Sequence, residues 1–320
     1  MRFELTDDQV SFRDAARDLL AKECPPEAVR QAWDAPLGSL DRGPWKGLEG
    51  MGVLSLLVPE DRGGMGLDET YLVPILEECG RVALPHPVVD TAMVAAPLLG
   101  ADAGMVTTDL GGPSSPCAAD ADTHLLHLAG GLWSAPAAGV AVHDVAEPVD
   151  RSRRLGRVAA SGGERVLVTD DPAVVQLALQ RGALGTAAVL VGLSQAMLDL
   201  TVAYVKERHQ FGKPIGSFQA VKHHLADAAL AIEFARPATW RAAWSLAHGS
   251  PTAGRDASMA KVMANDAAEL VGRKALQCHG AIGYTVEADL HLFLKRSWAL
   301  TRSWGDSASH TDRVADAIGA

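Results

Sequence analysis

Residues 204–219 carry the side chains with the clearest chemical potential in this sequence. A helical pattern ends in this segment, and the chain then turns through two glycines and a proline before the next helix. Arg208, at the end of the first helix, offers a planar fork of donors that suits a pyrophosphate. Phe211 could cover the face of an aromatic ring. Taken singly, each residue is better explained by an ordinary helix–helix connection.

Other patterns that could support chemistry are incomplete. The run Gly63–Gly66 is interpreted as a turn, because no strand precedes it and no Lys-Ser/Thr pair follows. His223 and His224 are neighbours on a predicted helix and face different directions, so they cannot form a metal-binding pair four residues apart. The four cysteines include no Cys-x-x-Cys pair: Cys24, Cys79, Cys117 and Cys278. We therefore expect no metal site.

The first hundred residues are predicted to be helical. Thr6 and Gln9 form a capping box, and apolar residues follow at helical spacing. The first helix must end before Pro25 and Pro26, because proline lacks the N–H that would continue it. Further helices are predicted over residues 45–51, 68–79 and 88–99.

The character of the sequence changes after Gly100. Between Met105 and Asp170 the apolar runs are short and are separated by turn residues, which is typical of strands. Strands are predicted over residues 106–108, 125–128, 139–142 and 165–168. Helical periodicity then returns, with helices predicted over residues 183–204, 220–247, 257–278 and 287–298. This order predicts a helical domain over 1–102, a small β domain over 103–170 and a helical domain over 171–320.

Composition limits the classes of partner. The 320 residues are 48% hydrophobic and carry a net charge of −10, which is ordinary for a soluble globular protein but unsuited to nucleic acid or an anionic membrane. No run of 18 uninterrupted apolar residues occurs, so we expect no membrane span. The charged N-terminal residues lack the apolar core of a signal peptide. A cytoplasmic location is expected.

Two segments resemble the signatures of the acyl-CoA dehydrogenase family. The first, residues 207–219, reads Glu-Arg-His-Gln-Phe-Gly-Lys-Pro-Ile-Gly-Ser-Phe-Gln; the second, residues 277–284, reads Gln-Cys-His-Gly-Ala-Ile-Gly-Tyr. The domain order matches as well, so the resemblance covers essentially the full chain. It implies a mainly α fold with a small central β domain: an N-terminal helical domain, a β domain and a C-terminal four-helix bundle, assembled as a dimer or a dimer of dimers.

The resemblance implies FAD as the cofactor. In the family, residues at the positions of Arg208, Phe211 and Gln277 contact the ADP part of an FAD seated mainly in the neighbouring subunit. The backbone around Gly280 and Ala281 closes on the same pyrophosphate, where small residues let the main chain approach. Ala281 stands where the family usually has a second glycine. We expect this half of the FAD site to be functional.

The catalytic base of the family is absent from both of its usual positions. The family reaction removes a proton from Cα of an acyl-CoA while hydride leaves Cβ for the flavin, and it needs a carboxylate base. Counting from the two signatures places Trp304 and Gly182 at the two positions where the family carries a glutamate. The Thr-Glu-Pro, Gly-Ser-Asp and aromatic-Ile-Thr segments of the family's β domain are also missing, so the flavin-ring grip is expected to be lost.

These losses resemble the short partner subunits of heteromeric α2β2 acyl-CoA dehydrogenases that shorten steroid side chains in actinobacteria. The leading hypothesis is a subunit without its own base, which completes the FAD site of a catalytic partner. The partner would bind most of the acyl-CoA, and an electron-transfer flavoprotein is a possible acceptor. One alternative is a homomeric dehydrogenase whose base is displaced to Asp306 or His310. Another is a flavin-free scaffold or regulatory subunit, against which Arg208 argues.

Overall fold

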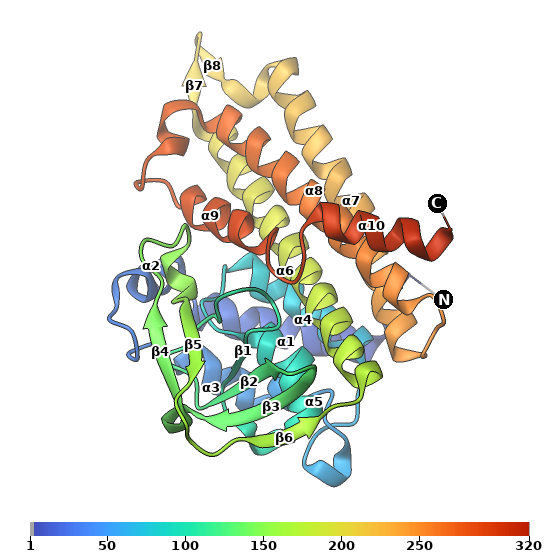
Figure 1. Cartoon of the computed structure of the whole chain (residues 1–320). Coiled ribbons are helices and arrows are strands. Elements are labelled where there is room, and N and C mark those ends of the chain that lie inside the picture. The colour runs from blue at the N-terminus through green and yellow to red at the C-terminus, as the bar shows by residue number, and fades with distance from the viewer. Residues whose placement is uncertain (1–2, 320) are drawn as a thin grey trace.

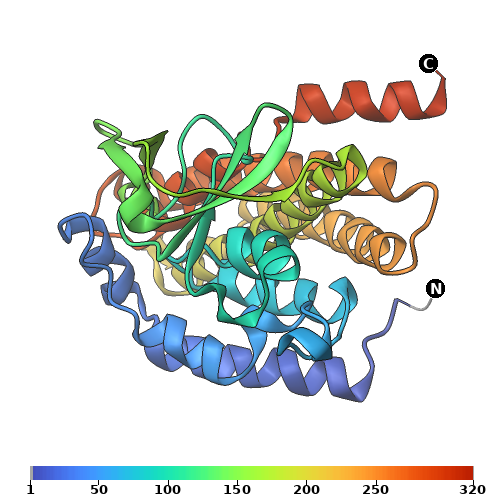
Figure 2. The same cartoon turned by 60° about the horizontal axis from the view of Figure 1, so that its bottom comes forward.

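The computed structural model describes residues 3–319 and shows three groups of elements along the chain (Figures 1 and 2). A group of helices comes first, a small group of strands follows, and a bundle of long helices completes the chain. The first group consists of α1 (Asp7–Glu23), α2 (Pro26–Asp34), α3 (Gly43–Gly50), η1 (Val53–Ser55), η2 (Glu60–Arg62), α4 (Glu69–Arg81), η3 (Val89–Ala95), α5 (Ala96–Leu99) and η4 (Ala101–Ala103).

The N-terminal helices begin and end where local chemistry directs. The hydroxyl of Thr6 accepts the Gln9 N–H at 3.3 Å, and the Gln9 side chain accepts the Thr6 N–H at 2.9 Å, which confirms the predicted capping box. α1 ends at Glu23, before the two prolines, as predicted, and Pro26 is the first residue of α2, where a missing N–H is tolerated. The predicted helix over 88–99 is π-helical in its first part, η3, and α-helical only in α5.

The middle group contains six strands. They are β1 (Val106–Thr108), β2 (Thr123–Leu128), β3 (Gly131–Pro136), β4 (Val140–Asp144), β5 (Gly156–Ala160) and β6 (Val166–Thr169), with η5 (Ala137–Gly139) and η6 (Arg151–Arg153) between them. One sheet has the order β1-β2-β3-β6, in which only β1 and β2 are parallel, and β4 pairs with β5 in a separate antiparallel hairpin. The four predicted strands are confirmed as β1, β2, β4 and β6, with small changes in their bounds.

The third group is the bundle. It consists of α6 (Pro172–Glu207), α7 (Gln219–Ala247), α8 (Ala253–His279), α9 (Leu290–Leu300) and α10 (Ser307–Ile318), with the short hairpin β7 (His209–Gln210) and β8 (Lys213–Pro214) and the 3-10 turns η7 (Ile215–Ser217) and η8 (Gly280–Tyr284). The helix predicted over 183–204 begins earlier, at Pro172, because Asp171 caps it by accepting the Ala173 N–H at 2.8 Å. By length and composition alone α6 could cross a membrane, but 61% of its most apolar window is buried inside the protein.

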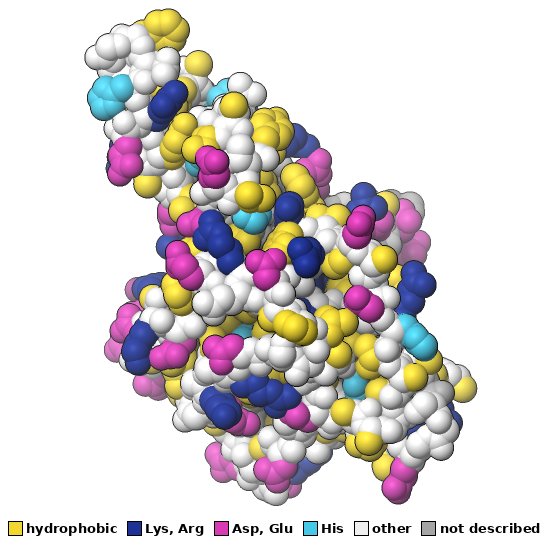
Figure 3. All heavy atoms as spheres, turned by 90° about the vertical axis from the view of Figure 1, so that its left-hand side faces the viewer, with side chains coloured by type: hydrophobic (Ala, Val, Ile, Leu, Met, Phe, Trp, Pro, Cys, Tyr) yellow, Lys and Arg dark blue, Asp and Glu magenta, His cyan; other side chains and the backbone are white. Residues whose placement is uncertain are grey.

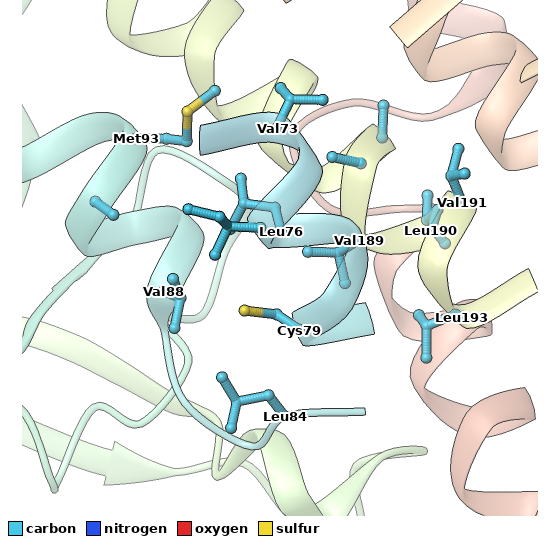
Figure 4. Packing of buried hydrophobic residues seen from close by; sticks show 14 of the residues in the cluster. Val73, Leu76, Cys79, Leu84, Val88, Met93, Val189, Leu190, Val191 and Leu193 are labelled. Carbon is cyan, nitrogen blue, oxygen red and sulfur yellow. The ribbon is translucent and has the colours of Figure 1, made fainter. Parts of the chain in front are cut away.

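The core joins the first helical group to the bundle. Val73 and Leu76 of α4 and Val189 and Leu193 of α6 are buried in one hydrophobic cluster (Figure 4). The two backbones touch, because a Cβ at Gly192 would lie 1.9 Å from the carbonyl oxygen of Glu77. Glycine is therefore required where α4 crosses α6. This contact fixes α4 against α6, and Cys79 and Val189 of these helices line the cavity described below.

Candidate functional site

The β7–β8 hairpin presents Arg208 and Phe211 to solvent at one end of the bundle. Arg208 is the C-cap of α6, and its backbone N–H donates to the Tyr204 carbonyl at 2.9 Å. Its side chain is exposed and takes part in none of the ion pairs found within residues 3–319. Phe211 has a φ of 52° at the tip of the hairpin and is 92% exposed. A phenylalanine this exposed, three residues from an exposed arginine, suits a surface that is completed by another molecule.

The second predicted segment lies at the same end of the bundle. Tyr204 of α6 stacks on His279 of α8 with ring centroids 4.4 Å apart, and its hydroxyl reaches the His279 carbonyl at 3.4 Å. Gln277 is exposed, and Gly280 ends α8 with a φ of 64°. No atom lies within 4 Å of the position that a Cβ of Gly280 would occupy, so its backbone is open to a ligand.

Ala281 completes this set. It is exposed and follows Gly280 in η8. Figure 3 shows hydrophobic side chains, in yellow, on the same end of the molecule. The structure thus brings all five predicted cofactor residues to one exposed end of the bundle: Arg208, Phe211, Gln277, Gly280 and Ala281.

The two positions expected to hold the catalytic base occupy a single place in the fold. A Cβ at Gly182 of α6 would lie 2.1 Å from Cε3 of Trp304, so the indole packs directly on the glycine backbone. Trp304 is 7% exposed and has a φ of 60°. The backbone N–H of Trp304 donates to the Gly111 carbonyl at 2.8 Å, and the backbone carbonyl of Trp304 accepts from His310 Nε2 at 2.8 Å. The indole therefore occupies the space that a side chain at residue 182 would need.

The two fallback bases point elsewhere. Asp306 is exposed and caps α10, where it accepts the Ser309 N–H at 2.9 Å, and this hydrogen bond lowers the pKa of its carboxyl. His310 is buried, and its Nδ1 lies 3.1 Å from the Ser258 hydroxyl. Burial lowers the pKa of His310 to about 4. Neither side chain lines the cavity that Trp304 borders.

That cavity contains a carboxylate that sequence reasoning missed. It measures about 60 Å³, and its walls include Trp304, Thr186 and Val189 together with Asp90 of η3. Asp90 is 5% exposed, and burial raises its pKa to about 7. The available signal was that Asp90 is the only charged residue in the apolar stretch 88–99.

A second missed residue, Lys261 of α8, holds the loop that carries Trp304. Its ammonium donates to Asn265 Oδ1 at 2.7 Å and to the carbonyls of Gly305 at 3.0 Å and Leu300 at 3.2 Å. Lys261 is 0% exposed, and burial lowers its pKa to about 7. Within the described part of the chain, no cluster of three or more His, Cys, Asp or Glu residues could hold a metal ion.

Comparisons with known proteins agree with this architecture. The acyl-CoA dehydrogenase N-terminal domain family matches residues 6–102, and the acyl-CoA dehydrogenase C-terminal domain family matches residues 173–319. The acyl-CoA dehydrogenase IpdE2 of Mycolicibacterium smegmatis is 32% identical over 309 residues, which are 92% of this chain and 93% of that protein. The acyl-CoA dehydrogenase FadE34 of Mycobacterium tuberculosis is 33% identical over 97% of this chain but only 48% of its own length.

Solved structures share the whole fold. A variant of the Tcur3481-Tcur3483 steroid ACAD superposes with a TM-score of 0.86 at 25% identity over 98% of each chain. The ChsE4-ChsE5 complex of Mycobacterium tuberculosis contains a chain with a TM-score of 0.87 at 23% identity, covering 100% of this chain and 99% of that one. Butyryl-CoA dehydrogenase of Megasphaera elsdenii gives 0.88 at 20% identity over 100% of each. With its domain matches, its full-length relative and its fold in agreement, this chain belongs to the acyl-CoA dehydrogenase family.

Proposed function

We propose that this chain is a subunit of an FAD-dependent acyl-CoA dehydrogenase that lacks its own catalytic base and completes the FAD site of a partner subunit. The observation that carries the proposal is the contact between Trp304 and Gly182. Desaturation needs a carboxylate that accepts the Cα proton. Here both base positions share one volume, and the indole fills it.

The other half of the proposal rests on the exposed end of the bundle. Arg208 can hold a pyrophosphate by its guanidinium fork, and the open backbone at Gly280 and Ala281 can approach the same group. Phe211 and Gln277 lie at the same end. These residues fit the ADP part of FAD, which when bound would accept the hydride from substrate. The isoalloxazine would be held by the partner, since the β-domain segments that grip it in the family are missing.

Two relatives favour a heteromer. One similar structure is named for two components, the ChsE4-ChsE5 complex, and another is a steroid ACAD named Tcur3481-Tcur3483. Only 48% of the length of FadE34 aligns with this chain. In FadE34 a region similar to this chain is therefore part of a polypeptide about twice as long. We therefore propose an α2β2 assembly in the cytoplasm that acts on a bulky, steroid-type acyl-CoA and passes electrons to an electron-transfer flavoprotein.

The alternatives find less support. A homomeric enzyme with a displaced base would need Asp306 or His310 at the cavity, whereas Asp306 caps α10 and His310 binds the Trp304 carbonyl. A flavin-free scaffold would have no use for an exposed guanidinium at Arg208. The packing of Trp304 on Gly182 and the exposed residues at the end of the bundle therefore support the same role, a subunit that completes a partner's FAD site.

The test is flavin stoichiometry with and without a partner. Purified alone, the chain should bind little FAD and show no acyl-CoA dehydrogenase turnover; co-expressed with its catalytic partner, the complex should carry FAD absorbing near 450 nm. Arg208→Gln should then lower FAD affinity by about tenfold or more, because a charge-assisted hydrogen bond is lost. Lys206→Gln, an equally exposed change of charge two residues away, is the matched control and should have no effect.

A homomer with stoichiometric FAD and robust turnover would refute the proposal. Loss of that turnover in Asp306→Asn would assign the base to the displaced position instead. A purified complex without a 450 nm band would favour the scaffold.

A further inference from the structure

The cavity beside Trp304 has polar walls for which the proposed function has no use. Asp90 and Arg153 line it, and so does His86. His86 Nε2 lies 2.9 Å from the Asp41 carbonyl, which can only accept, so Nε2 carries the ring proton. The opposite nitrogen, Nδ1, is buried and has no hydrogen-bond partner within residues 3–319. A buried free acceptor beside a cavity indicates that the cavity has polar contents.

Asp90 and Arg153 both line the cavity, and the charge of each acts on the other. Arg153 is the charged group that most favours the ionised form of Asp90. Nevertheless, no ion pair within 4.0 Å joins the two side chains among the ion pairs of the described residues. Arg153 is half-buried at the wall, in η6, while Asp90 is buried in η3. A cavity lined by both residues suits a group that accepts from a guanidinium and shares a proton with a carboxyl.

The remaining titratable groups around the cavity are neutral or already paired. Arg296 of α9 is bound to Asp150 and does not compete for a ligand. Burial lowers the pKa of His86 to about 4, so its ring is uncharged near neutral pH. Burial also raises the pKa of the Cys79 and Cys117 thiols well above neutrality. Among the described lining residues Arg153 is thus a cation without an ion pair within 4.0 Å, although the nearby Asp150 charge favours its ionised form, and Asp90 is the group that titrates.

The rest of the wall is apolar. Val89, Val189, Leu300 and Trp304 contribute to it. A volume of about 60 Å³ is well above the roughly 10–15 Å³ that a single water requires, so a small molecule has room in it. A molecule that fills this space has a small polar head and a short hydrocarbon tail.

We propose that this cavity binds a short-chain carboxylate, whose carboxylate is held by Arg153 and shares the proton of Asp90 while its tail lies against Val189 and Trp304. The guanidinium fork matches a carboxylate in shape and charge. This site lies within one chain and does not depend on the proposed role at the FAD.

Binding of the carboxylate must then be coupled to protonation of Asp90. Two ionised carboxylates cannot share the site, so Asp90 has to be protonated when the ligand is bound. The pKa of Asp90 is about 7 in the free chain. The protonated fraction falls as the pH rises through this value, while a simple carboxylic acid stays ionised. Affinity should therefore fall about tenfold between pH 6 and pH 8, with uptake of a proton near pH 7.

Calorimetric titration of the chain with acetate, propionate and butyrate tests the proposal. Propionate or butyrate should bind more tightly at pH 6 than at pH 8, and buffers of different ionisation enthalpy should reveal the proton taken up. Asp90→Asn should bind with little pH dependence, because its amide donates at every pH. Arg153→Gln should lose binding, whereas Arg151→Gln, which changes an exposed arginine outside this cavity, should not.

Propionamide provides the neutral comparison and should bind more weakly than propionate at pH 6. Three results would overturn the proposal: no heat with any of the acids, which would leave water as the contents of the cavity; equal propionate affinity at pH 6 and pH 8; or binding that survives Arg153→Gln. If Arg153→Gln does not fold, Asp90→Asn still decides the matter, since it replaces a buried carboxyl by a neutral group of the same shape.

Discussion

The indole of Trp304 is confined by two glycines that pack against it. A Cβ at Gly182 would lie 2.1 Å from its ring, and one at Gly111 would lie 2.8 Å from it. The indole cannot yield easily, because its backbone is bound to Gly111 and His310. Gly182→Ala is therefore expected to lower the free energy of unfolding by about 1–3 kcal/mol, the usual cost of overpacking. Urea denaturation of the purified chain or complex measures this change.

The control for this prediction is the same substitution without the indole. In a Trp304→Ala background the added methyl has room, and alanine is favoured over glycine in a helix by about 1 kcal/mol. Gly182→Ala should then be neutral or stabilising. An equal penalty in both backgrounds would mean that the contact is not what excludes a side chain at residue 182.

The sequence could identify individual residues of interest but not which residues they contact in the fold. Counting from the signatures led to Gly182 and Trp304 separately, yet nothing in the spacing shows that they touch. Asp90 escaped notice for a related reason. A lone aspartate in an apolar helix is conspicuous only once the fold shows that its side is buried against a cavity.

Helix α8 holds the loop that carries Trp304 in place. Lys261 donates to Asn265 and to the carbonyls at the end of α9 and of Gly305. The Leu300 carbonyl also accepts the Ser303 N–H at 3.1 Å, whereas the lysine supplies the donor for the Gly305 carbonyl, which follows the helix. Burial lowers the pKa of Lys261 to about 7, and the Asp306 charge opposes this change.

Lys261 should make stability depend on pH. In the unfolded chain its pKa is about 10.4, so between pH 7 and pH 10 the unfolded state holds a proton that the folded state has released. The contribution of the lysine to stability therefore rises with pH over this range. Relative to Lys261→Met, the wild type should gain on the order of 2 kcal/mol between pH 7 and pH 9.

Urea denaturation of the two proteins at several pH values gives the difference directly, and other titrating groups cancel in it. Lys274→Met, at a partly exposed lysine of the same helix, is the matched control and should show no such slope. A wild-type advantage that shrinks toward pH 9 would contradict the prediction.

The sequence predicted the long elements well because periodicity survives single exceptions. The capping box of α1, the glycine and proline breaks and the apolar stripes all carry local physical signals. β3 and β5 were missed, since Gly131–Pro136 and Gly156–Ala160 are short, rich in small residues and bounded by turn signals. The π-helical geometry of η3 depends on packing against α6 and β1, which no local pattern encodes.

The parts of the whole molecule are tied together by buried charge. The Arg296 guanidinium of α9 donates to Asp150 of the β region and to the Leu84 carbonyl that follows α4. Arg154, 2% exposed, binds Asp120 and the Ala32 carbonyl. These bonds attach the β region firmly to the helices on either side of it in the chain.

The outer face of the bundle is the region that assembly should cover. Leu230 and Phe234 lie one turn apart on α7 and are 57% and 67% exposed. Burying a phenylalanine contributes about 1.5–3 kcal/mol, so Phe234→Asp should weaken assembly by roughly tenfold to a hundredfold. Sedimentation velocity over a dilution series measures this, and circular dichroism verifies that the chain remains folded.

The matched control is Val166→Asp, at an apolar and 59% exposed position on β6. If both substitutions reduce assembly alike, general loss of stability is responsible; if neither does, the partner binds a different face, and the exposed end around Phe211 becomes the next surface to test.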